Sequence, residues 1–184
     1  MTEKMIILIF AAIAVVLFVA CVALLVLLGK RVAKAKGDAG VDATTEGLNF
    51  AGFQNEAAQL NLCEYAVVSA KLKNWPQILE TFGGDDAQNV LKYLYQSFKA
   101  NLSTAEPAAR VSGGSFCLLI KNREIAFVRT RIERITEAVN RFNGTRKIPY
   151  IFDMRYGVYM PKRNDEDLLT MCEISAQLAD SAQR

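Results

Sequence analysis

The chain has no histidine among its 184 residues. Histidine is the commonest general base near neutral pH and the commonest metal ligand. Any site in this chain must therefore do without histidine in either role. The four cysteines, Cys21, Cys63, Cys117 and Cys172, form no C-x-x-C pair. In a reducing cytoplasm such cysteines are most simply buried small apolar side chains. We therefore expect them to serve packing.

Charged residues are also missing from the stretch between Ile6 and Gly29. As a helix this stretch would be about 36 Å long, enough to cross a bilayer. It is too long for the core of a cleaved signal peptide, which spans roughly 7–15 residues. A lipoprotein signal at Cys21 is another alternative, but the chain stays apolar beyond it, from Val22 to Leu28. The sequence predicts a transmembrane helix that is retained.

The flanking charges predict the orientation of this helix. Four basic residues follow it, whereas the N-terminal side has Lys4 offset by Glu3. The basic residues are Lys30, Arg31, Lys34 and Lys36. The positive-inside rule therefore predicts a single-pass protein of the inner (plasma) membrane, with the lipid bilayer as a partner and a cytoplasmic C-terminal domain. The predicted segments are a short extracytoplasmic N-terminus (1–5), the transmembrane helix (6–29), a basic juxtamembrane linker (30–45) and a folded domain (46–184).

The net charge of +3 comes from the membrane-flanking residues. From residue 37 onward the chain has 17 basic residues (22 less 5) and 18 acidic residues (19 less 1). This part of the chain has no basic surplus with which to bind a phosphate backbone. We therefore expect no nucleic-acid partner.

Helical and strand patterns alternate after the linker. The predicted helices cover residues 50–62, 75–82, 87–102 and 123–142, with a last one ending near 182. The predicted strands cover 65–73 and 148–158, together with a hairpin between them. Asp85 or Asp86 is expected to cap the third helix, and Asn164 or Asp165 the last. This order predicts an α/β (α+β) fold, with a mixed, partly antiparallel sheet flanked by helices.

The hairpin is centred on the adjacent glycines Gly113 and Gly114. A short run ending at Val111 precedes them, and the apolar run Phe116 to Ile120 follows. Glycine pairs tolerate the positive φ angles of tight turns, so the pattern predicts strand, turn and strand. A glycine pair alone only turns the chain, so its function depends on its neighbours.

In order and spacing, these segments resemble the GGDEF domain of diguanylate cyclases, whose fold is related to nucleotide cyclases and polymerase palms. The resemblance covers roughly Asp42 to Ala182. The corresponding stretches are Asp42 to Leu48 for D-x-L-T-G-L, Thr81 to Gly84 with Val90-Leu91 for T-Y-G-H…V-L, Arg110 to Phe116 for R-x-G-G-D-E-F, Tyr156 to Val158 for S-I-G-V-A, and Asp167 to Leu169 for E-L-L.

The resemblance implies two GTP-bound metal ions held by carboxylates of the first strand and the hairpin, because hard divalent cations prefer anionic oxygen. In this chain Lys71 stands at the position of the first-strand aspartate. Gly114 and Ser115 stand at the acidic pair, after Gly113. Shifting the alignment by one residue restores no acid. We therefore expect no metal ion or other cofactor.

Other positions that the family uses are also changed. Leu79 and Gln88 stand where the resemblance places the guanine-reading asparagine and aspartate, and Asp180 stands at a phosphate-binding lysine. The inhibitory R-x-x-D falls at Ser103 to Glu106, without its arginine. Lys71 is either a solvated lysine at a strand end or a phosphate-binding residue in the vacant metal position.

Taken together, the resemblance implies a membrane-anchored, degenerate GGDEF-like domain that is no enzyme. Its expected role is regulatory or scaffolding in cyclic di-GMP signalling, as a homodimer or in association with active GGDEF or phosphodiesterase proteins. One alternative is a nucleotide sensor that retains a GTP or cyclic di-GMP cleft. A second alternative is a residual diguanylate cyclase.

Overall fold

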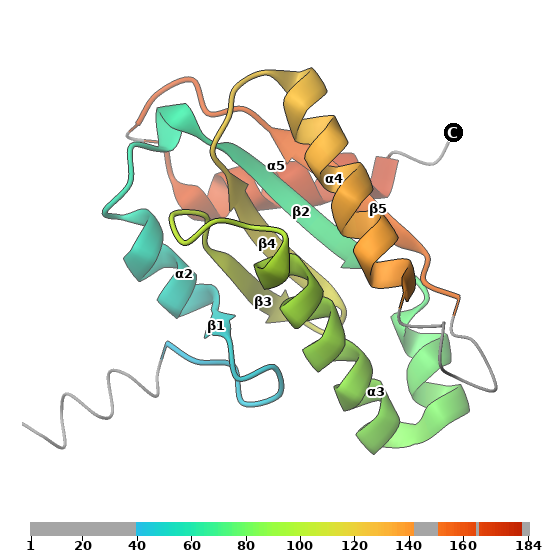
Figure 1. The fold of residues 1–184 in the computed structure, drawn as a ribbon. Helices are drawn as coiled ribbons and strands as arrows, with labels where there is room; N and C mark the ends of the chain where they lie inside the picture. Colours follow the sequence, from blue (N-terminus) through green and yellow to red (C-terminus); the bar gives the residue numbers. More distant parts are fainter. Residues whose placement is uncertain (1–39, 142–150, 165, 182–184) are drawn as a thin grey trace, which may run out of the picture. The chain divides into compact units, whose positions relative to one another are not determined.

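Five strands form the sheet at the centre of the fold: β1 (Leu48–Asn49), β2 (Ala66–Leu72), β3 (Ala108–Ser112), β4 (Ser115–Ile120) and β5 (Met154–Tyr159). The computed structural model describes residues 40–141, 151–164 and 166–181. The strands lie in the order β1-β3-β4-β2-β5 (Figure 1). β1 is parallel to β3, and the other neighbours are antiparallel. The predicted mixed, partly antiparallel sheet is confirmed.

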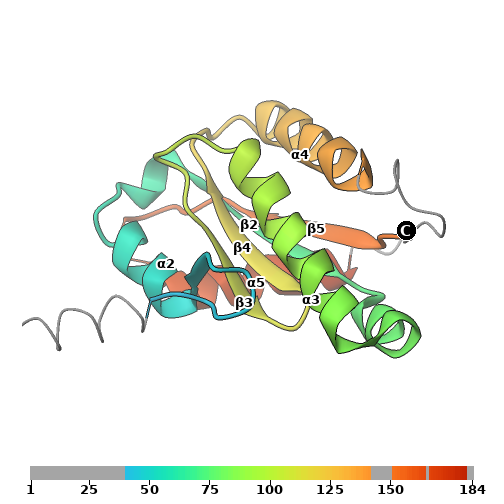
Figure 2. The same ribbon diagram turned by 60° about the horizontal axis from the view of Figure 1, so that its bottom comes forward.

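Helices cover both faces of this sheet (Figures 1 and 2). The α-helices are α2 (Phe50–Ala57), α3 (Trp75–Ala100), α4 (Ile125–Asn140) and α5 (Leu168–Ser181), and a short 3₁₀ helix, η1, spans Leu62–Glu64. α3 and α4 pack on one face, where they share a hydrophobic cluster with β2 and β4. α2 and α5 pack on the opposite face against a second cluster.

The alternation along β2 builds both clusters. Ala66, Val68 and Leu72 face α3 and α4, as the sequence pattern predicts. Val67 faces α2 and α5. Ser69 is buried on the same face, beside Cys117 of β4 and Ser175 of α5. Successive side chains of a strand point to opposite faces, so a strand buried on both sides reads as nearly continuous apolar sequence. β2, paired with β4 on one side and β5 on the other, therefore contributes to both layers.

α3 consists of two helical stretches that meet at Gly83. Gly83 has φ +78°, a left-handed conformation that glycine adopts without steric cost. The predicted break between two helices at Gly83-Gly84 is thus confirmed. The predicted cap is wrong, because the non-helical residue is Gly83, and Asp85 and Asp86 already lie inside the helix.

The last predicted helix is confirmed as α5, but Asn164, one of its two predicted caps, does not cap it. The side chain of Asn164 accepts a hydrogen bond from Leu62 N, at 2.6 Å, and so supports η1. Asp167 caps α5 instead, accepting from Thr170 N at 2.9 Å. Asp165 lies outside the described residues.

Three predicted elements are shorter than expected. The first helix ends at Ala57, and the residues between it and η1 are not helical. α4 begins at Ile125, and the described part of the fifth strand begins at Met154. Ile125 is 54% exposed, so the apolar stripe of α4 is buried only from Val128 onward. Helix ends of this kind depend on tertiary packing, which the periodicity of a sequence does not contain.

Within the described residues, no helix combines the length and apolarity needed to cross a bilayer. The predicted transmembrane helix at 6–29 lies outside the described residues, as do the part of the linker before residue 40 and residues 142–150.

Candidate functional site

The pairing of β2 with β4 brings the predicted site residues of the first strand and the hairpin together. Lys71 is the direct cross-strand partner of Ser115. Gly114 O accepts a hydrogen bond from Leu72 N at 2.9 Å, so the turn lies against the end of β2. The structure therefore places Lys71 beside the Gly113–Ser115 turn, as the alignment with the GGDEF pattern requires.

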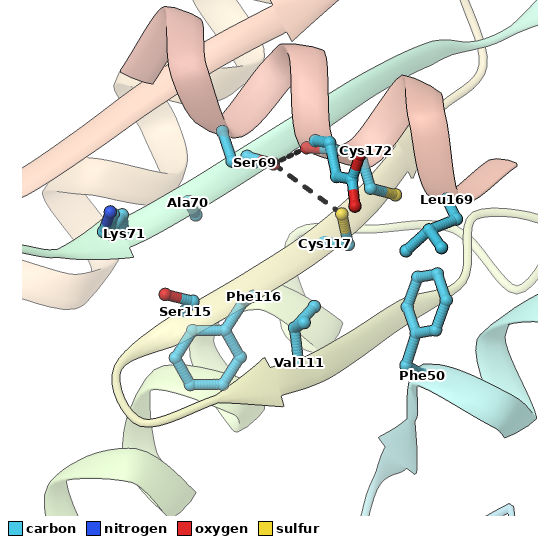
Figure 3. A pocket seen from close by; sticks show the side chains of 12 residues that line it. Phe50, Ser69, Ala70, Lys71, Val111, Ser115, Phe116, Cys117, Leu169 and Cys172 are labelled. Carbon is cyan, nitrogen blue, oxygen red and sulfur yellow. Dashed lines mark hydrogen bonds between the residues drawn. The ribbon is translucent and has the colours of Figure 1, made fainter. Parts of the chain in front are cut away.

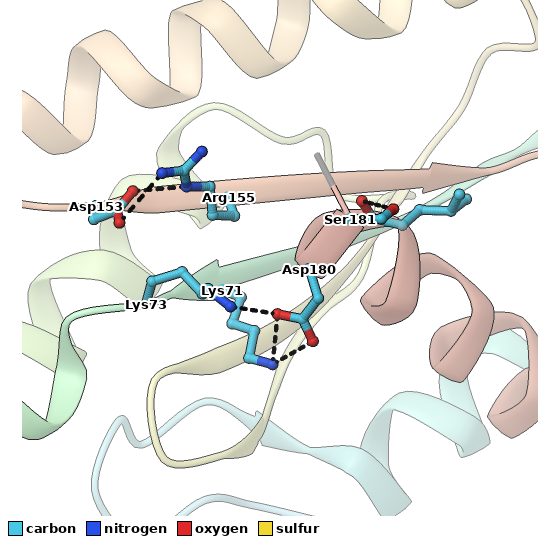
Figure 4. Close-up of polar contacts among 7 residues, drawn as sticks. Lys71, Lys73, Asp153, Arg155, Asp180 and Ser181 are labelled. Atoms are coloured by element: carbon cyan, nitrogen blue, oxygen red, sulfur yellow. Dashed lines mark hydrogen bonds and ion pairs between the residues drawn. The ribbon is translucent and has the colours of Figure 1, made fainter. Parts of the chain in front are cut away.

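Lys71 is held by an ion pair with α5 (Figure 4). Its Nζ lies 2.7 Å from Oδ2 of Asp180, and Lys73 Nζ lies 2.8 Å from Oδ1 of the same carboxylate. Hydrogen bonds from Lys71 and then Lys73 lower the pKa of Asp180. Two ammonium groups thus share one carboxylate, which leaves a net positive charge. Neither of the two predicted roles of Lys71 included this ion pair with Asp180.

The hairpin turn is shaped by its two glycines. Gly113 has φ +48°, and Gly114 is buried. A Cβ atom added to Gly114 would lie 3.0 Å from the Cβ atoms of both Leu72 and Trp75. This spacing is tighter than ordinary van der Waals contact. Position 114 is therefore adapted to glycine, and an acidic side chain there would require Leu72 or Trp75 to move.

The strand before the turn is anchored to the start of the described chain. Arg110 Nη1 donates to Asp42 Oδ2 at 3.0 Å, and Arg110 Nε donates to Gly113 O at 2.9 Å. Burial acts to raise the pKa of Asp42, but hydrogen bonds from Thr45 and the charge of Arg110 hold it below its ordinary value. This ion pair therefore fixes β3 and the turn.

Leu79 and Gln88 do not join this group. Both are exposed on α3, one on each side of the break at Gly83, and Leu79 is 44% exposed. Leu79 has no polar group in the place of an asparagine amide, and Gln88 has a neutral amide in the place of an aspartate carboxylate.

A pocket of about 130 Å³ opens beside Lys71 and Ser115 (Figure 3). Its wall is largely apolar and comes from β2, β3, β4, α5 and the first residue of α2. Prominent lining residues are Phe50, Val111, Leu169, Cys117, Cys172 and Glu173. Val111 and Leu169 are 44% and 45% exposed, so apolar surface continues outside the pocket. The alignment with the GGDEF pattern did not predict this pocket, because its wall combines five elements distant in sequence.

Glu106 occupies the last position of the altered R-x-x-D segment and is buried within the protein. Its carboxylate accepts from Ser103 N at 2.7 Å, from Lys121 N at 2.8 Å and from Arg131 Nη2 at 2.9 Å. Burial acts to raise the pKa of Glu106, but these bonds and the charge of Arg131 hold it below its ordinary value. Glu106 is thus committed to internal contacts.

A family model described as "Diguanylate cyclase, GGDEF domain" matches residues 41–183 of the chain. No curated protein matches this chain in sequence.

Several solved structures share the fold. The coiled coil and GGDEF domain of DgcB from Caulobacter crescentus, in complex with c-di-GMP, has a TM-score of 0.71 at 16% identity, covering 91% of this chain and 92% of that one. Diguanylate cyclase SiaD from Pseudomonas aeruginosa, in complex with its activator SiaC, has a TM-score of 0.68 at 15% identity, covering 99% and 74%. The S helix-GGDEF-EAL part of Vibrio cholerae LapD, bound to c-di-GMP, has a TM-score of 0.67 at 17% identity, covering 84% and 37%.

Proposed function

Because the chain belongs to the GGDEF family of diguanylate cyclase domains, we propose that it is a catalytically inactive member with a regulatory or scaffolding role in cyclic di-GMP signalling. The observation that carries the proposal is the Lys71–Asp180 ion pair beside Ser115. On our alignment, the ammonium group of Lys71 and the hydroxyl of Ser115 stand where the family pattern has carboxylates.

The side chains at this point do not fit divalent metal ions. Mg²⁺ and similar hard cations need carboxylate oxygens, whereas Lys71 repels them. At about 4 Å this repulsion is roughly twice the interaction between two unit charges, or several kcal/mol at intermediate dielectric. The nearby carboxylate of Asp180 is already shared by Lys71 and Lys73. No set of three cysteine, aspartate or glutamate side chains in the described ranges is grouped for an ion.

The intact scaffold supports a role in binding other proteins. The sheet, the hairpin turn and the helix layers of the family are all present, and exposed Val111 and Leu169 adjoin the pocket. The SiaD structure holds an activator, SiaC, and the LapD structure joins a GGDEF domain to an EAL domain. We propose that this chain associates with active GGDEF or phosphodiesterase proteins, or with a second copy of itself, from an anchor in the plasma membrane.

The first test is turnover of GTP. The purified full-length chain, incubated with GTP and Mg²⁺ or Mn²⁺, should form no cyclic di-GMP, while an active diguanylate cyclase assayed in parallel does. A regulatory role further predicts that adding the chain changes the rate of such a cyclase, or of a cyclic di-GMP phosphodiesterase from the same organism. Product formation that a matched Lys71→Ala preparation loses would contradict the proposal and favour a residual cyclase.

The alternative is a nucleotide sensor, and the charge of the lysine pair favours it. Lys71 and Lys73 share one carboxylate, so a nucleotide phosphate could compete with Asp180 for either ammonium group. Isothermal titration with GTP, GDP and cyclic di-GMP separates the two roles. A Kd below about 100 μM, or roughly −5.5 kcal/mol, that is lost in Lys71→Ala would favour the sensor. The absence of binding would favour the scaffold.

A further inference from the structure

Two buried thiols meet at the pocket beside Lys71, one from β4 and one from α5 (Figure 3). Cys117 and Cys172 are 1% and 6% exposed, and both line the pocket. The hydroxyl of Ser69 lies between them, with its Oγ 3.7 Å from Cys117 Sγ and donating to Cys172 O at 3.2 Å. Two cysteines 55 positions apart in sequence are thus neighbours at one end of the cavity.

The two thiols differ in acidity because of their contacts. The hydrogen bond from the Cys172 thiol, with a second from Ser69, lowers the pKa of Cys117 despite its burial. The same contact with Cys117, together with burial, raises the pKa of Cys172. The thiolate is the form that reacts with oxidants and the form that a neighbouring donor stabilises. The contact thus favours the thiolate on Cys117 and the thiol on Cys172.

The cavity selects the reagents that can reach this pair. A volume of about 130 Å³ accommodates a molecule the size of hydrogen peroxide, whereas a tripeptide disulfide is too large for it. The wall is mainly apolar and opens beside the ammonium group of Lys71. Cys117 is 1% exposed but lines this pocket, so the pocket is the route by which a small peroxide would approach it.

We propose that Cys117 and Cys172 form a dithiol that a small peroxide oxidises to a disulfide. The Cys117 thiolate attacks one peroxide oxygen and the O–O bond breaks, giving a sulfenic acid on Cys117 and hydroxide, which takes up a proton to become water. The Cys172 sulfur, as it loses its proton, then attacks the Cys117 sulfur and displaces a second water. Two thiols and one peroxide thus yield one disulfide and two waters. The inference is independent of the proposed signalling role.

The bond would link the hairpin to the helix that holds the lysines. Cys117 lies two residues after Ser115 on β4, and Cys172 lies two turns before Asp180 on α5. α5 rests closely on the sheet, because the Cβ of an alanine at Gly157 would meet Ser175 O at 1.9 Å. Oxidation would therefore restrain α5 against β4 next to the Lys71–Asp180 pair.

The experiment uses the full-length chain in detergent with Cys21→Ser and Cys63→Ser, so that only the proposed pair remains. Treatment with hydrogen peroxide should lower the mass of the protein by two hydrogen atoms, and peptide mapping should find Cys117 linked to Cys172. A dithiol reductant should break this link. In the Cys172→Ser variant, a 1,3-dione probe should trap a sulfenic acid on Cys117. In the Cys117→Ser variant, Cys172 should oxidise much more slowly.

Differential alkylation of the unmutated chain keeps the test independent of folding in the variants. In that chain, peroxide should protect Cys117 and Cys172 from the alkylating reagent before the half-buried Cys63 is oxidised. A linked Cys117–Cys172 peptide formed at that stage supports the proposal. Oxidation of Cys63 first, with Cys117 and Cys172 still reduced, would overturn it.

Discussion

Lys71 and Asp180 carry charges opposite to those that the GGDEF pattern places at their positions. On our alignment, β2 has a base in place of an acid and α5 has an acid in place of a base. In the structure the two side chains form one ion pair, with Lys73 as a second donor. The opposite charges attract α5 to the end of β2. At the residue level, the pair is therefore a contact that joins β2 to α5.

The charge of Glu106 should contribute to the pH dependence of stability, because its carboxylate is buried and paired. Its folded pKa lies below the ordinary value, so its stabilising contribution is complete above about pH 4.5 and is lost as the pH falls through the folded pKa. Glu106→Gln should lower the free energy of unfolding at pH 7 by on the order of 1–3 kcal/mol, because Arg131 and two N–H groups lose their charged acceptor. Urea unfolding of both chains at several pH values measures this free energy.

The matched control for this prediction is Glu46→Gln. Glu46 is 75% exposed and pairs with Lys92 on the surface. Exposed pairs contribute little to stability, so this variant should unfold like the unmutated chain. The Glu106→Gln variant should also lose less stability between pH 7 and pH 3.5 than the unmutated chain. An equal loss in both would show that Glu106 is not the titrating group.

α5 lies close against the sheet at β5. Gly157 of β5 faces its backbone, and an added Cβ would lie 1.9 Å from Ser175 O and 2.4 Å from Ala179 N. Both contacts are backbone atoms and cannot rotate away. Gly157→Ala should therefore displace α5 and cost about 1–3 kcal/mol. Thermal unfolding and the reactivity of Cys172 with a thiol reagent both measure the change.

Gly84→Ala is the control, since no atom lies within 4 Å of its added Cβ and its φ is not positive. It sits in a helix, where alanine is favoured over glycine by roughly 0.8–1 kcal/mol. This variant should be unchanged or slightly more stable. Equal effects of the two substitutions would contradict the close contact between α5 and β5.

The elements differ in how far the sequence predicts them. The Gly113-Gly114 hairpin, the alternation of β2 and the helix break at Gly83 follow from local patterns, and all three are present. The predicted caps of α3, and the predicted cap Asn164 of α5, were wrong because a polar residue near a helix start can bind several partners; Asn164 binds Leu62 N. The ion pair of Lys71 and the thiol pair join residues far apart in sequence, so periodicity could not predict either contact.

For the described part of the chain as a whole, the two hydrophobic layers share one sheet. β2 contributes Val68 to the cluster under α3 and α4 and Val67 to the cluster under α2 and α5. Because adjacent residues of one strand hold both layers, loss of β2 would open both cores at once. Residues from Gly40 onward form one compact unit by themselves. Cooperative unfolding of that unit is the expected consequence.

A fragment from Gly40 to Arg184 with Cys63→Ser allows each layer to be followed separately in urea. Trp75, the only tryptophan of the chain, packs against the α3 and α4 side, and its fluorescence reports that layer. Cys117 and Cys172 lie in the other layer, and short pulses of a thiol reagent report their exposure. The two midpoints should coincide, because neither layer can keep its core after β2 leaves the sheet. Thiol exposure at clearly lower urea than the fluorescence change would mean that α2 and α5 detach while β2 stays paired, and that the two layers are independent.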